Sequence, residues 1–87
     1  MNANEWLDKA KEKEHLNSDY KLAKLIGIDS GGIANIRKRN GMDNFTAVRI
    51  AEILEIDKLK VIIDMEIQKA KTANKKEFWQ KKYDVYL

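Results

Sequence analysis

The chain has 87 residues, 44% of them hydrophobic and 36% charged, with no cysteine and no proline. This composition argues against a disordered basic peptide, and the length allows a single small domain with a thin margin of stability. The lack of cysteine excludes disulfides and thiolate metal sites. Because no long apolar run is present either, we expect a cytoplasmic protein that does not enter a membrane.

Helix formers dominate most of the sequence. Glycine occurs four times, always between positions 27 and 41, and the rest is rich in Ala, Leu, Ile, Lys and Glu. This distribution predicts an all-α domain. The first helix is expected over 4–14. The second is expected over 19–26, with Ser18 as its cap and Gly27 in the left-handed conformation just past its end.

Three further capping positions divide the remainder of the chain. A third helix is expected to start at a cap on Asp29 or Ser30 and to end at Arg39. Asn44 and Asp57 are expected to cap a fourth and a fifth helix, and the chain stays helix-prone to its end. We therefore predict a bundle of about five helices with a helical, aromatic-rich C-terminal extension.

No residue pattern points to catalysis. The chain has one histidine, no cysteine, no glycine-rich loop of phosphate-binding spacing and no serine set beside a base. Asp64 and Glu66 are two positions apart, so on a helix they do not face each other. We expect no enzyme activity, cofactor, metal or small-molecule substrate.

Positive charge is concentrated in one segment. The chain carries 17 Lys and Arg against 14 Asp and Glu, a net charge of +3. Positions 30–41 contain Arg37, Lys38 and Arg39 and no acid. The charge of this segment therefore equals the net charge of the whole chain. It follows a short helix and a glycine turn, an order typical of a helix-turn-helix, whose second helix enters the major groove of DNA.

Residues 18–64 resemble the lambda-repressor-like, or Cro/Xre-type, helix-turn-helix family. The stretch "LAKLIGI" is similar to the family's second helix and turn, "SGGIANIRKRNG" to its recognition helix, and "AVRIAEILEI" to the following core helix. The resemblance implies one DNA-binding domain over 1–87, with its core at about 18–64 and an extension at about 65–87. It implies a homodimeric transcriptional regulator, in particular a phage or prophage repressor on a palindromic operator.

The family often has a glutamine at the start of its second helix, where it touches a phosphate, but this chain has Asp19 there. A carboxylate at that position would repel a phosphate unless it faces away. The resemblance therefore leaves the docking on DNA open.

The expected contact face follows from helical geometry. If Ile33 and Ile36 point into the core, Gly31, Ala34, Asn35 and Lys38 face outward. Asn35 suits adenine, Ala34 a thymine methyl group, and Lys38 guanine or a phosphate. The complete set predicted to contact DNA, with Arg37 and Arg39 on phosphates, is Ser30, Gly31, Gly32, Ala34, Asn35, Arg37, Lys38 and Arg39.

The double glycine that opens the third helix has two interpretations. Bare glycines allow close packing on a neighbouring part of the protein, or they allow the helix backbone to approach DNA. We expect the first for Gly32, which lies nearer the core, and the second for Gly31.

The last ten residues hold four of the seven aromatic side chains. Two roles are open for them: closing the core against Trp6, or forming a dimer interface. They are Phe78, Trp79, Tyr83 and Tyr86. The lysines of this region are mostly balanced by nearby acids in the sequence, and we expect them to be a solvated surface rather than a second DNA site; they are Lys69, Lys71, Lys75, Lys76, Lys81 and Lys82.

A different class of function also fits. The same fold can serve as a protein-interaction module or antirepressor, with the aromatic tail binding another protein. The short side chains of Ser30, Gly31 and Gly32 favour this alternative, and the cations at 37–39 oppose it.

Overall fold

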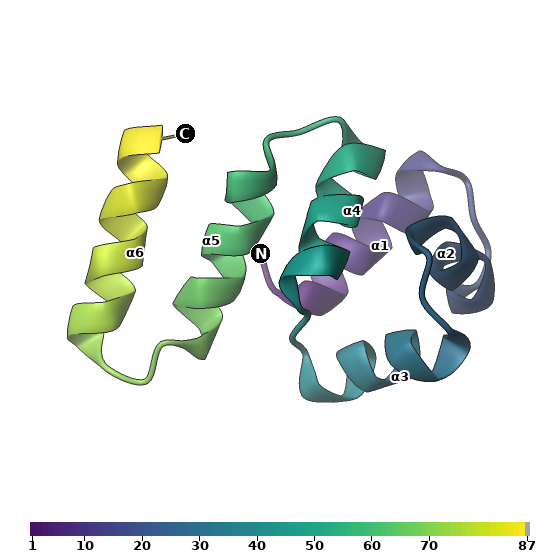
Figure 1. Ribbon diagram of the computed structural model, residues 1–87, viewed down its shortest axis with the longest axis horizontal. Helices are drawn as coiled ribbons and strands as arrows, with labels where there is room; N and C mark the ends of the chain where they lie inside the picture. The colour runs from purple at the N-terminus through teal and green to yellow at the C-terminus, as the bar shows by residue number, and fades with distance from the viewer. Residues whose placement is uncertain (87) are drawn as a thin grey trace.

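The computed structural model describes residues 1–86, and within them the chain forms helices and no strand (Figure 1). The predicted all-α class is therefore confirmed. The six helices are α1 (Ala3–Lys13), α2 (Asp19–Ile26), α3 (Ser30–Arg39), α4 (Asn44–Leu54), α5 (Lys58–Lys69) and α6 (Ala73–Tyr86).

Local capping sets the helix boundaries. Ser18 Oγ accepts the Lys21 N–H at the start of α2, and Gly27 ends that helix with φ of +96°, as predicted. The predicted cap of α4 is wrong by one position. Asp43, with extended backbone, accepts the Thr46 N–H, and Asn44 is already helical. A cap residue precedes the first helical residue. Because Asn44 is itself the first residue of α4, Asp43 takes the capping position.

One continuous core joins the first five helices. Trp6 and Leu7 of α1 pack with Leu22 and Ile26 of α2, and Ile50 of α4 lies among them. A short turn, residues 27–29, joins α2 to α3. Helix α3 lies across the lower edge of this group in Figure 1. None of the helices in residues 1–86 has the length and apolar character needed to span a membrane.

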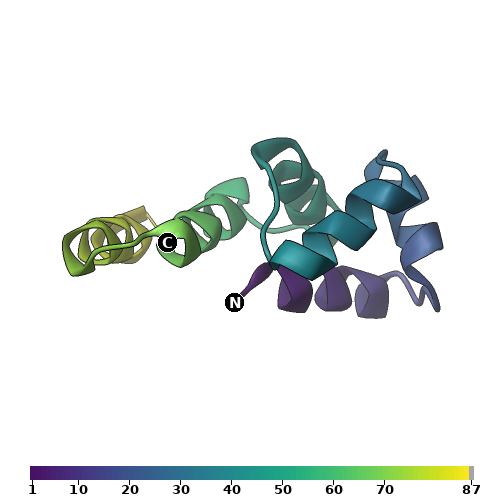
Figure 2. The ribbon, with the colours of Figure 1, turned by 90° about the horizontal axis from the view of Figure 1, so that it is seen from below.

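Helix α6 packs against α5 and buries none of its own residues. Figure 2 shows the two helices side by side, extending along the molecule away from α1–α4. On α5, Val61 and Met65 belong to the core cluster, whereas the buried Ile63 does not. Helix α5 therefore stands between the core and α6.

The four aromatic residues of α6 do not close the core. Phe78 and Tyr86 are 51% and 60% exposed, and Trp79 and Tyr83 are half-buried. Helix α6 packs on α5, and none of its residues belongs to the core cluster. The dimer interpretation of these residues stays a prediction.

Candidate nucleic-acid interface

Helix α3 lies with one apolar face inward. Ile33 and Ile36 are 2% and 4% exposed, which confirms the predicted orientation. Asp29 caps the helix start, and Asn40 ends it in the left-handed conformation. The opposite face is open to solvent and consists of Gly31, Ala34, Asn35 and Lys38.

Two side chains on this face, Asn35 and Lys38, carry polar groups that extend into solvent. Within residues 1–86, neither Asn35 nor Lys38 takes part in a side-chain hydrogen bond or ion pair, and both are exposed. The Asn35 amide offers donors and an acceptor together, and the Lys38 ammonium offers three donors. Both groups are therefore available to an external ligand.

Arg37 has a different environment, although it lies next to Lys38. Its Nε and Nη2 pair with the two carboxylate oxygens of Asp19, each at 3.0 Å. Nη2 also lies 2.7 Å from Asp8 Oδ1, and Nη1 donates to the backbone and side-chain oxygens of Asn4 at 3.2 and 3.0 Å. These contacts take up the guanidinium's donors inside the protein.

This cluster accounts for the presence of a carboxylate, Asp19, at the start of α2. The hydrogen bonds from Arg37 lower the pKa of the Asp19 carboxyl, burial opposes them, and Lys11, whose Nζ lies 3.1 Å from Oδ1, adds to the lowering. Its negative charge is thus matched by two cations. Asp19 therefore holds α3 against α2 through Arg37.

An amide pair completes the attachment of α3 to α1. The Asn4 side-chain nitrogen donates to the Arg37 carbonyl at 3.1 Å and to Asn40 Oδ1 at 2.9 Å, and the Asn4 N–H donates to the same Asn40 oxygen. Sequence reasoning missed both asparagines in this role. They lie 36 positions apart, and no local spacing signals their contact.

The two glycines of α3 have distinct surroundings. A Cβ on Gly32 would come within 3.1 Å of Asp29 Oδ1, the oxygen that accepts the Gly32 N–H. This supports the structural interpretation of Gly32, because its bare Cα leaves room for the cap. A Cβ on Gly31 would be 3.5 Å from the same oxygen, an ordinary contact, so no packing requirement explains this glycine.

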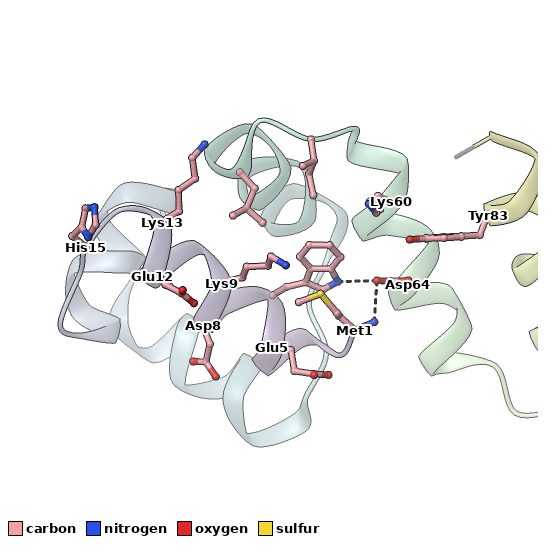
Figure 3. Close-up of a pocket in the computed structure, with 13 residues that line it drawn as sticks. Met1, Glu5, Asp8, Lys9, Glu12, Lys13, His15, Lys60, Asp64 and Tyr83 are labelled. Atoms are coloured by element: carbon pink, nitrogen blue, oxygen red, sulfur yellow. Dashed lines mark hydrogen bonds and ion pairs between the residues drawn. The ribbon is translucent and has the colours of Figure 1, made fainter.

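A hollow of the molecule also lies away from α3, on the side of α1. It has a volume of about 930 Å³ between α1, the start of α5 and Tyr83 of α6 (Figure 3). At its base, Asp64 accepts the Trp6 indole N–H at 3.1 Å. Acids and lysines alternate along its walls, among them Asp8, Lys9 and Glu12. This mixture of signs does not favour a polyanion.

No family model, curated protein or solved structure matches the chain. The likeness to the Cro/Xre family therefore rests on residues 18–64 of the sequence alone, and membership stays a prediction.

Proposed function

We propose that the protein is a sequence-specific double-stranded DNA-binding transcriptional regulator. In this proposal α2, the turn after it and α3 form a helix-turn-helix, and α3 enters the major groove. The observation that carries it is the open face of α3. Asn35 and Lys38 project from it with no side-chain partner among residues 1–86, while Ile33 and Ile36 opposite them are buried.

Each proposed contact follows from side-chain chemistry. Asn35 pairs with adenine, Ala34 lies against a thymine methyl group, and Lys38 reaches guanine or a phosphate. The start of the helix brings Ser30 and the backbone at Gly31 and Gly32 close to DNA. Arg39 is exposed and binds a phosphate. Arg37 acts through the protein, by holding α3 on α1 and α2.

The protein acts as a homodimer in this proposal, without a cofactor. One helix reads few base pairs, whereas two copies related by a two-fold axis match a palindromic operator with half-sites one helical turn apart. Exposed apolar side chains on α6, including Phe78 and Tyr86, supply a surface for pairing. The likeness to small phage regulators favours repression by occupying an operator.

Selection from a randomised DNA duplex library tests the proposal. We expect the wild-type protein to enrich a palindromic sequence and to retard it in a gel-shift titration at 50 mM salt. Replacing Asn35 by alanine should relax the preference at one adenine in each half-site, by about 1–3 kcal/mol of discrimination, because a bidentate contact is lost.

Tyr20→Phe is the matched control, since Tyr20 is exposed on α2 and lies outside the proposed contact set. It should enrich the same sequence as the wild type. Failure of the wild type to enrich any sequence, or the same enriched sequence for Asn35→Ala, would refute this function.

The alternative of a protein-interaction module is favoured by one observation, the exposed Phe78 and Tyr86 on a helix with no buried residue. The selection separates the two functions, because an interaction module would leave the library unenriched.

A further inference from the structure

The end of α5 and the start of α6 carry four exposed lysines, which we call the hairpin lysines: Lys69, Lys71, Lys75 and Lys76. The sequence predicted that neighbouring acids would balance them. Within residues 1–86 only Lys69 has such a partner, Glu66, with its Nζ 3.6 Å from the carboxylate. The other three make no ion pair there, so a positively charged cluster remains open to solvent.

This cluster lies beside the basic end of α3. A hollow of about 400 Å³ separates the loop after α3 from the end of α5. Arg39 and Asp43 line one side of it, and Gln68 and Lys69 line the other. The Asp43 carboxylate already accepts the Thr46 N–H. Figure 1 shows α3 and the turn between α5 and α6 along the same lower edge of the molecule.

The dimensions suit a duplex lying along that edge. The molecule is 37 Å long, close to the roughly 34 Å of one turn of DNA. Helix α3 occupies only part of this length. DNA carries about one negative charge per 1.7 Å of its axis, so the duplex beside the recognition site also presents phosphates. A duplex placed on α3 along this edge would bring its flanking backbone toward the turn between α5 and α6.

We propose that the hairpin lysines form a second DNA contact, on phosphates next to the sequence that α3 reads. This inference rests on the proposed function and deepens it. Lysine bonds to phosphates carry no base information, so the contact strengthens binding and sets orientation without changing sequence preference.

The chain offers a matched pair of variants to test this contact. Lys75→Gln/Lys76→Gln removes two adjacent charges at the start of α6, and Lys81→Gln/Lys82→Gln removes two adjacent charges nearer the opposite end of that helix. Lys81 is paired with Glu77 and Lys82 lies over the Phe78 ring. All four lysines are on the α6 surface, and the two variants have the same net charge.

The measurement is the affinity of full-length protein for a fluorescein-labelled duplex enriched by the wild type, between 50 and 200 mM KCl. We expect the Lys75/Lys76 variant to lower the slope of log K against log salt by about 0.9 for each lost contact in each subunit. Each such contact corresponds to about 3.5-fold in affinity over this salt range. The Lys81/Lys82 variant should keep the wild-type slope, and Lys75→Arg/Lys76→Arg should restore it.

Three results would overturn the inference while the proposed function stands. They are an unchanged slope for the Lys75/Lys76 variant, equal reductions in both glutamine variants, and an altered set of preferred bases in the Lys75/Lys76 variant. If the wild type binds no duplex at low salt, the proposed function fails and this contact fails with it.

Discussion

Neighbouring residues of α3 differ sharply in what surrounds them. In the part of the chain that the structure describes, Lys38 and Asn35 face solvent with no side-chain partner, whereas Arg37 pairs with Asp8 and Asp19. The reason is geometric. The Arg37 side chain projects from the flank of α3 that meets α1 and α2. Its donors therefore pair with the carboxylates of Asp8 and Asp19. Charge alone therefore does not distinguish a ligand-binding cation from a structural one.

The pairing of Asp19 predicts a pH dependence of stability. The folded-state pKa of Asp19 is below its unfolded value, so the stabilisation is complete above the unfolded pKa of about 3.9 and is lost as pH falls through the folded value. Asp19→Asn should lower the free energy of unfolding by about 1–2 kcal/mol at pH 6. Urea titrations of both proteins should show this difference shrinking below about pH 4; a difference that is constant down to pH 2 would contradict the assignment.

Elements are delimited by contacts within a single turn of helix. Ser18 and Gly27 bound α2, and Asp29 and Asn40 bound α3. These boundaries place the turn that connects the two helices and hence the direction of α3. The two glycines of this region that lack close neighbours, Gly27 and Gly31, differ in backbone conformation. Gly27 has φ of +96°, and Gly31 is helical.

This difference predicts opposite effects of one substitution. Gly27→Ala should destabilise the protein by about 1 kcal/mol, because L side chains rarely adopt that backbone conformation. Its added Cβ would meet only Phe45 Cζ, at 4.0 Å, so packing contributes little. Gly31→Ala should be neutral or stabilising by up to about 1 kcal/mol, because it reduces the freedom of the unfolded chain. Thermal unfolding of both variants would refute this account if the two shifts had the same sign and size.

Within residues 1–86, five helices share the core, and the sixth, α6, packs on α5. A 14-residue helix is marginal in isolation, so packing on α5 must stabilise α6. Its outer side retains Phe78 and Val85, seven positions apart on one face and 51% and 75% exposed. This exposed apolar stripe is the part of the molecule best suited to a second copy.

Phe78→Glu should shift the protein from dimer to monomer in sedimentation experiments, because it places a charge within that apolar stripe. The change should leave the helical circular dichroism spectrum intact, since α6 contributes nothing to the core. Tyr20→Glu makes a comparable change at an exposed aromatic residue on α2 and should leave the assembly unchanged. A wild-type protein that sediments as a monomer at all concentrations would contradict the proposed dimer.

Much of the fold was predictable because helices depend on interactions only a few residues apart. Asp19–Ile26 has the predicted bounds, Asp57 caps α5 as expected, and Ile33 and Ile36 mark the buried side of α3. The exposed face with Asn35 and Lys38 followed from the same periodicity.

Only the tertiary structure decided which charges are already partnered and which surfaces meet. Arg37 pairs with Asp19 at a separation of 18 positions and with Asn4 at 33, and α5 lies between α6 and the core. The same packing brings Lys69 to the hollow that Arg39 lines. Such contacts depend on how whole helices pack, and a sequence pattern that spans one or two helical turns does not contain that information.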